Sequence, residues 1–228
     1  MSEADVYLAV GDSLTAGYAV GPNHSFASLF SAFLASRLSG LRYINLGRNG
    51  LTTGGLAGMA VNNPQVRNLL SRAKVISITI GSNDLLGPGL KLIKDGPFNL
   101  PAVLTKMAAN LEVIGRQIRL LNRKALVLVA GIYNPLPAGA FPGYASQAQT
   151  IIDQANLLLL AWAKKFAFRL VPLDRIFKGR EGFLLGRDRL HPGFPGHQAI
   201  AAGFIRIWLQ GQRTVFSRNP RWDFLKGA

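Results

Sequence analysis

Five short apolar runs, separated by segments of helical periodicity, constrain the fold of this 228-residue chain more than any other feature. The run KVISITIG at 74–81 is β-branched and apolar on both faces, which is typical of a central strand in a parallel sheet. The other predicted strands span 6–12, 42–47, 125–133 and 168–174. Because parallel strands need crossovers that return over the sheet, this alternation predicts an α/β fold with helices on both faces.

The segments between these runs repeat apolar residues at helical spacing. The predicted helices span 25–38, 64–73, 100–122, 145–166 and 196–210. The last of them is apolar almost all round, so we expect it to be well buried. In sheets of this kind the ligand site lies beyond the carboxyl ends of the strands, and functional residues should therefore follow strands in the sequence.

Length and composition favour one domain, 1–228, with a core at about 5–210 and a basic, aromatic tail at 211–228. Hydrophobic residues make up 49% of the chain, which is enough to bury a sizeable core. The absence of cysteine excludes disulfides, cysteine-based zinc sites and thiol catalysis. No apolar run approaches the roughly 20 residues of a membrane span, and the start MSEADVYLAV lacks the basic region of a signal peptide, so we expect a cytoplasmic protein.

The net charge of +15 is unusual for a chain of this composition. It would suit an anionic partner, but no nucleic-acid-binding motif or continuous basic run accompanies it. We therefore expect no nucleic-acid partner and interpret the charge as a solvated, arginine-rich surface. The tail mixes basic and aromatic side chains, which suits either weak contact with an anionic membrane surface or packing back on the domain through Trp222.

Four short segments fall where the strands of such a sheet should end. They read GDSL at 11–14, GRNGLTT at 47–53, GSND at 81–84 and DRLHP at 188–192. Each alone is typical of a turn. Together they hold a serine, an acid, a histidine and several hydrogen-bond donors, which are the groups that acyl transfer requires.

Ser13 is the candidate nucleophile, and a serine hydroxyl needs a base within hydrogen-bond reach. Of the three histidines, His191 follows Asp188 by three residues, so a carboxylate on the same turn can hold one ring nitrogen and leave the other for the serine. We interpret His24 and His197 as structural or exposed. No further histidine or cysteine nearby completes a metal-ligand set, so we predict neither a metal nor a cofactor.

The negative charge that develops on the carbonyl oxygen needs preorganised donors. Ser13 offers its own backbone N–H, and Gly50 has no side chain to obstruct its amide. Asn83, at the end of the central strand, offers a side-chain NH2 group. Taken separately, each glycine is more typical of a turn residue with positive φ, and Asn83 is more typical of a helix cap. The prediction depends on their meeting at one end of one sheet.

These four segments resemble the four blocks of the GDSL, or SGNH, hydrolases, which contribute Ser, Gly, Asn and His in this order. The second block is the loosest match, since its glycine is either Gly47 or Gly50, of which Gly50 aligns better. The resemblance implies a three-layer α/β/α sandwich with a five-stranded parallel sheet and a flavodoxin-like strand order. The site residues that it implies are Ser13, Asp188 and His191 as catalytic triad, and Ser13, Gly50 and Asn83 as oxyanion hole.

Two apolar segments rich in glycine and proline, 85–101 and 133–144, follow strands and should border the cleft as an acyl pocket. The residues predicted to bind substrate are Asp12, Leu85, Leu86, Phe98, Leu136 and Phe141. We therefore predict a serine esterase or lipase that acts on small-molecule esters with short to medium lipophilic acyl chains.

Other functions stay open at this point. A carbohydrate O-acetyl esterase or a thioesterase would use the same triad, and a non-catalytic binding module would use the same fold. A nucleotide-binding protein is disfavoured, because the chain has neither G-x-G-x-x-G nor a P-loop motif. A conventional α/β-hydrolase is excluded by the absence of G-x-S-x-G.

Overall fold

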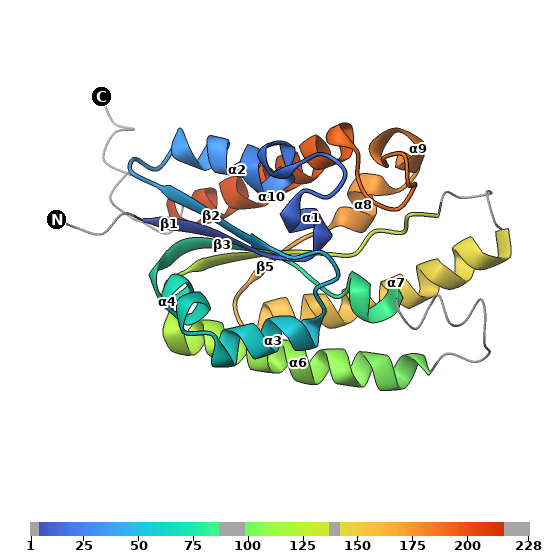
Figure 1. The fold of residues 1–228 in the computed structure, drawn as a ribbon, viewed down its shortest axis with the longest axis horizontal. Coiled ribbons are helices and arrows are strands. Elements are labelled where there is room, and N and C mark those ends of the chain that lie inside the picture. The colour runs from blue at the N-terminus through green and yellow to red at the C-terminus, as the bar shows by residue number, and fades with distance from the viewer. Residues whose placement is uncertain (1–4, 87–98, 137–141, 217–228) are drawn as a thin grey trace, which may run out of the picture.

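Five parallel strands form one sheet at the centre of the computed structural model, which describes residues 5–86, 99–136 and 142–216 (Figure 1). The strands are β1 (Val6–Gly11), β2 (Arg42–Gly47), β3 (Ala73–Thr79), β4 (Leu126–Ala130) and β5 (Arg169–Val171). Their order is β2-β1-β3-β4-β5, with every neighbouring pair parallel. This confirms the predicted α/β class and the flavodoxin-like strand order. In this order, successive strands are added on one side of β1 up to β2 and on the other side from β3 onward, so the switch point lies between β1 and β3.

Helices cover both faces of the sheet and complete the predicted three layers (Figure 1). One layer holds α2 (Phe26–Ala35), α8 (Leu173–Phe177) and α10 (Phe194–Phe216), with the short α1 (Ser13–Ala16), the 3-10 turn η1 (Pro22–His24) and α9 (Glu181–Leu184) at its edge. The other layer holds α3 (Thr53–Asn62), α4 (Pro64–Arg72), α6 (Leu100–Leu121) and α7 (Pro142–Lys165).

The residues of β1 explain why a strand of this kind is apolar without alternation. Leu8 and Val10 belong to the core on the α3, α4, α6 and α7 side, whereas Tyr7 and Ala9 belong to the core on the α2, α8 and α10 side. Because successive side chains point to opposite faces, burial of both faces requires an uninterrupted apolar run. Tyr7 keeps its hydroxyl satisfied through a 2.8 Å hydrogen bond with Ser77 of β3.

Several predicted boundaries are wrong, each for an identifiable reason. The predicted strand 125–133 stops at Ala130, because Asn156 of α7 takes over the backbone pairing of the next residues: its Oδ1 accepts from the Ile132 N–H at 2.7 Å, and its Nδ2 donates to the Ile132 carbonyl at 2.8 Å. The predicted strand 168–174 is reduced to Arg169–Val171, followed by proline.

Helix α3 is absent from the sequence-based prediction, since its ten residues TGGLAGMAVN include three glycines that weaken helical propensity. The predicted end of the last helix at residue 210 is also wrong, since α10 continues to Phe216. The part of the tail on which the membrane-surface prediction depends, 217–228, lies outside the described residues. Among the described residues, no helix is both long and apolar enough to cross a membrane.

Candidate active site

The turn that joins β1 to α1 places Ser13 at the carboxyl end of the sheet, beside the point where the strand order reverses. Gly11 makes this turn possible: it has a φ of 150°, and a Cβ atom there would lie 2.3 Å from the Thr79 carbonyl oxygen of β3. Ser13 is the first residue of α1, so its backbone N–H has no acceptor within that helix. Both the hydroxyl and the N–H of Ser13 are therefore available for chemistry.

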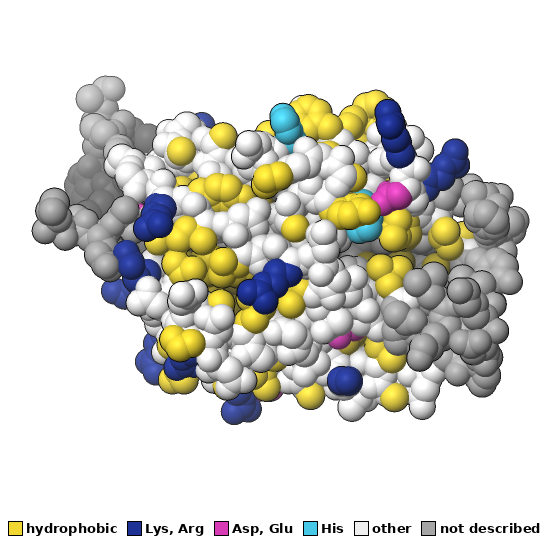
Figure 2. Space-filling view, in the orientation of Figure 1, with side chains coloured by type: hydrophobic (Ala, Val, Ile, Leu, Met, Phe, Trp, Pro, Cys, Tyr) yellow, Lys and Arg dark blue, Asp and Glu magenta, His cyan; other side chains and the backbone are white. Residues whose placement is uncertain are grey.

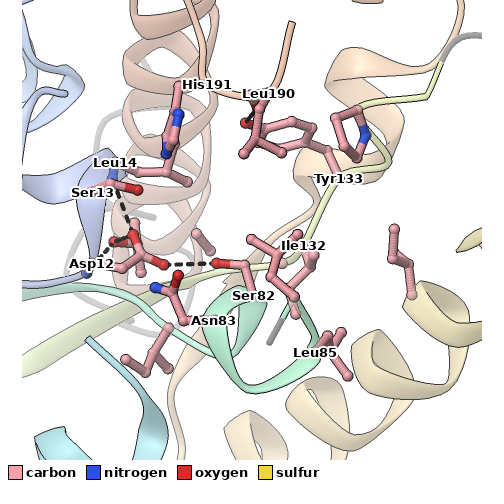
Figure 3. A pocket seen from close by; sticks show the side chains of 17 residues that line it. Asp12, Ser13, Leu14, Ser82, Asn83, Leu85, Ile132, Tyr133, Leu190 and His191 are labelled. Carbon is pink, nitrogen blue, oxygen red and sulfur yellow. Dashed lines mark hydrogen bonds between the residues drawn. The ribbon is translucent and has the colours of Figure 1, made fainter. Parts of the chain in front are cut away.

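Asp12 lines the same pocket as Ser13, but its carboxylate is occupied by the protein (Figure 3). Oδ1 accepts from the Thr79 hydroxyl at 2.8 Å and from the Leu14 N–H at 3.1 Å, and Oδ2 accepts from the Ser82 hydroxyl at 2.9 Å. Burial, with 1% of the residue exposed, raises the pKa of Asp12, although these hydrogen bonds act to lower it. Asp12 thus fixes the serine turn to the end of β3, and its contact with substrate stays a prediction.

Asp188 and His191 form the acid–base pair that the sequence predicts. Asp188 Oδ2 lies 2.7 Å from His191 Nδ1, while Oδ1 accepts the backbone N–H groups of Leu190 at 3.0 Å and His191 at 2.9 Å. Burial would raise the pKa of Asp188, but these hydrogen bonds together hold it below its usual range. The ionised carboxylate therefore favours the imidazole tautomer with its proton on Nδ1.

His191 lies over Ser13 and lines the same pocket (Figure 3), while its Nδ1 atom is held by Asp188. No hydrogen bond joins Ser13 to His191 within the described part of the chain. Such bonds are often long in ligand-free enzymes and close when substrate binds. The Nε2 atom is thus left for the serine hydroxyl, as the triad requires.

Two tyrosines that the sequence analysis missed hold the His191 loop. Tyr133 donates its hydroxyl to the Leu190 carbonyl at 2.7 Å, and Tyr18 packs its ring against His191 with centroids 4.4 Å apart. The Gly186 N–H also donates to the His191 carbonyl at 2.7 Å. Tyr18 lies inside the stretch GDSLTAGY, but nothing in its local spacing indicates that it meets a residue so distant in the sequence.

Asn83 faces the pocket from the helical turn 82–86, directly after β3 (Figure 3). Its Nδ2 donates one hydrogen to the Leu51 carbonyl at 3.0 Å, which orients the amide and leaves the second N–H for a ligand. Next to it, Asp84 accepts from the Thr53 N–H at 2.9 Å and from the Thr53 hydroxyl at 2.6 Å, so the segment GSND is tied to the start of α3. The sequence analysis assigned no role to Asp84.

Gly50 and Gly47, the two alternatives for the second block, have different structural roles. Gly50 has a φ of 75° in the turn closed by the Leu51 N–H and the Arg48 carbonyl, and a Cβ atom there would meet nothing within 4 Å. Gly47 allows α1 to approach β2, since a Cβ atom there would lie 2.2 Å from the Ala16 nitrogen. Gly50 does not line the pocket that holds Ser13, Asn83 and His191, although Leu51, its neighbour, binds Asn83.

The pocket next to Ser13 has an apolar wall and a volume of about 90 Å³. Leu85 and Leu86 line it as predicted, whereas Leu136 does not, and Phe98 and Phe141 lie outside the described residues. Tyr133 and Pro135, from the predicted segment 133–144, line it as well. Further apolar lining residues, which the sequence analysis missed, include Leu14, Ile80, Ile132 and Ile152. Ile152 comes from α7, a helix that no feature of the sequence places at the cleft.

The remaining histidines have separate environments, as predicted. His24 is exposed and meets Phe194 edge to face, with ring centroids 5.6 Å apart. His197 is buried in α10, and its Nδ1 accepts the Phe26 N–H at 3.0 Å. Burial lowers the pKa of His197 to about 4, although the Tyr18 backbone acts in the opposite direction.

We expect His197 to make the protein less stable in acid. Folded His197 stays neutral down to about pH 4, whereas an unfolded histidine takes up a proton near pH 6.5, so the unfolded state binds more protons between these values. The free energy of unfolding should therefore fall by on the order of 3 kcal/mol from pH 6.5 to pH 4. Urea unfolding of the protein and of His197→Asn, which keeps an acceptor for Phe26, measures this loss.

The comparison with His197→Asn isolates the histidine from other buried groups. Asp12, whose pKa is raised, acts in the opposite direction in both proteins and cancels between them. The substitution should flatten the pH dependence. If the free energy of unfolding falls equally in the two proteins between pH 6.5 and pH 4, His197 is not the cause of the loss.

Comparisons with known proteins agree with this geometry. Residues 9–199 match the GDSL-like Lipase/Acylhydrolase family. The chain is 28% identical over 215 residues to the spore germination lipase LipC of Bacillus licheniformis, covering 88% of this chain and 97% of that protein. Among solved structures it is similar to the lipase Lip_vut3 from a goat rumen metagenome, with 26% identity, a TM-score of 0.79, and 89% of this chain and 97% of that one covered.

An acetylxylan esterase, Axe2 from Geobacillus stearothermophilus, shares the fold at 21% identity and a TM-score of 0.66, with 89% of this chain and 93% of that one covered. The family match extends over the serine turn, the Asn83 segment and the Asp188–His191 loop, which are the segments that the sheet brings together. The chain therefore belongs to the GDSL-like lipase/acylhydrolase family and is a carboxylic ester hydrolase.

Proposed function

We propose that this protein hydrolyses esters of short to medium lipophilic carboxylic acids through an acyl-enzyme on Ser13. The observation that carries this proposal is one pocket that combines Ser13, Asn83 and His191 with a wall that is mostly apolar. Polar groups that perform the chemistry lie at one side of the pocket, and the rest of its surface suits a hydrocarbon chain. The similarity to two proteins described as lipases supports the same substrate class.

In the proposed reaction, His191 Nε2 takes the proton from the Ser13 hydroxyl as the oxygen attacks the ester carbonyl. The negative charge on the carbonyl oxygen is stabilised by the free N–H of Asn83 and the backbone N–H of Ser13, with the Gly50 amide as the third donor. Asp188 stabilises the imidazolium, which then protonates the departing alcohol. Water repeats the sequence on the acyl-enzyme and releases the acid.

A series of esters with one leaving group, from acetate to dodecanoate, tests the acyl preference. Each methylene buried against the apolar wall contributes up to about 0.8 kcal/mol, so kcat/KM should rise up to about four-fold per carbon until the pocket is filled. Longer chains should then lose activity. A maximum at acetate, with each added carbon lowering kcat/KM, would instead favour a carbohydrate O-acetyl esterase, a function similar to that of the acetylxylan esterase Axe2.

A further inference from the structure

We propose that a groove beside the catalytic histidine binds the alcohol part of the ester and selects alcohols that carry a phosphate group. The groove, which we call the alcohol groove, is lined by Tyr18, Ala19, Val20, His24, Gly186, Arg187, Asp188, Gly193 and Phe194. The proposal depends on the proposed ester hydrolysis, because it assigns a substrate class to the same site. It gives a role to Arg187, to which none has been assigned above.

The order of proton transfers decides which part of the substrate lies on the His191 side of Ser13. The imidazolium must deliver its proton to the oxygen of the departing alcohol, so the alcohol lies next to His191 while the acyl chain lies on the other side of Ser13. The apolar pocket extends from Ser13 towards Ile132 and Leu85, away from His191 (Figure 3). The alcohol groove begins at Tyr18, whose ring touches His191, and at Asp188.

Exposed aromatic side chains give the groove a surface that binds organic groups. Tyr18 is 46% exposed and Phe194 is 42% exposed, and both line the groove. His24 stands edge-on to Phe194 and also lines the groove. Aromatic rings that stay exposed at a concave surface next to a catalytic centre favour contact with a substrate over a purely structural role.

The charge at the groove favours an anionic group. Arg187 lines it, Arg189 lies two residues away, and both are exposed without an ion pair among the described residues. Of the described residues that line the groove, Asp188 is the one carboxylate, and its oxygens already accept three hydrogen bonds from His191 and Leu190. Figure 2 shows basic side chains close to the acidic and histidine side chains on this face.

A guanidinium group binds phosphate through paired hydrogen bonds, which matches its planar arrangement of donors. The chain as a whole, with a net charge of +15, also attracts anionic substrates over longer distances. An acyl ester of glycerol phosphate combines the two requirements of the site: a hydrocarbon chain for the apolar pocket and a phosphorylated alcohol for the groove.

Two esters with the same acyl chain and the same linkage test this proposal: 1-butanoylglycerol and 1-butanoylglycerol 3-phosphate. The measured quantity is the ratio of kcat/KM for the phosphorylated ester to kcat/KM for the neutral one. We expect a ratio of about two to five at low salt, the range of a partly exposed charge pair, and a decrease towards one in high salt. Arg187→Gln should lower the ratio several-fold.

Arg123→Gln is the matched control, because it removes the same charge from the loop before β4, at the opposite end of the parallel sheet. It should leave the ratio unchanged. Phe194→Ala should lower kcat/KM for both esters by a similar factor, since the ring contacts the alcohol whatever its charge. Glycerol 3-phosphate should inhibit hydrolysis of the neutral ester competitively, and Arg187→Gln should weaken that inhibition.

The outcomes separate this proposal from the proposed function. If the wild-type protein hydrolyses neither ester, the ester hydrolysis proposed above is wrong. If it hydrolyses the neutral ester but the ratio is one or less, or Arg187→Gln and Arg123→Gln change it equally, the phosphate preference is wrong. If Phe194→Ala leaves both rates unchanged, the groove does not hold the alcohol.

Discussion

Replacing Ser13 with alanine should lower ester hydrolysis by at least about four orders of magnitude, because the residues of a triad act as a unit and removal of the nucleophile leaves only binding and oxyanion stabilisation. The fold should be unaffected, since no hydrogen bond to the Ser13 hydroxyl is found among the described residues. Hydrolysis of a butanoate ester by the purified variant measures the loss, and circular dichroism with the thermal midpoint verifies the fold.

Ser71→Ala provides the matched control for this substitution. Ser71 lies in α4, and its hydroxyl donates to the Asn68 carbonyl within the helix, away from the pocket. This variant should keep full activity. An organophosphonate should add one covalent group to the wild-type protein and to Ser71→Ala, but none to Ser13→Ala. Hydrolysis by Ser13→Ala within ten-fold of the wild-type rate would place the nucleophile elsewhere.

Asn83→Ala should lower kcat by roughly 10²–10³ with a much smaller change in KM, because a donor aimed at the oxyanion acts mainly in the transition state. The loss of the hydrogen bond to Leu51 is a separate structural effect of this substitution. Steady-state kinetics over a series of concentrations of the butanoate ester separate kcat from KM. A change confined to KM would mean that Asn83 only binds the substrate.

Asn110→Ala tests how much of that effect comes from loosening the neighbouring segments. Asn110 Nδ2 donates to the Thr53 hydroxyl at 3.0 Å, in the network that joins α3 to Asp84, and Asn110 does not line the pocket. Its removal disturbs the support of the site without removing a donor to the substrate. We expect kcat to decrease by no more than a few-fold. A decrease as large as that of Asn83→Ala would mean that both substitutions act by displacing the loop that carries Asn83.

The parts of the site that the sequence predicts are those that depend on local relations. Asp188 and His191 are three residues apart on one turn, so their contact at 2.7 Å needs no other element. Ser13 and Asn83 follow apolar runs directly, and parallel strands bring such positions to one edge of the sheet. The hydrogen bonds that hold the Asp12 carboxylate were not predicted, because their donors Thr79 and Ser82 lie far along the chain.

The extent of the strands and the shape of the pocket depend on contacts between distant segments. Asn156 of α7 ends β4 by pairing with Ile132, and Ile152 of the same helix forms part of the pocket wall. Tyr18 reaches His191 across most of the length of the chain. None of these contacts leaves a periodic signal in the residues around it.

The sequence by itself determined the α/β class, the order of the catalytic segments along the chain and the acid–base pair, because apolar periodicity and spacing on one turn are properties of neighbouring residues. The tertiary structure alone decided that Ile80, Ile132 and Ile152 line the pocket next to Ser13. It also decided that Asp12 is buried, and that Tyr18, Phe194 and Arg187 share one groove beside His191. The physical reason is that these features arise from packing between helices and loops far apart in the sequence, where burial and hydrogen bonding with distant partners override local preference.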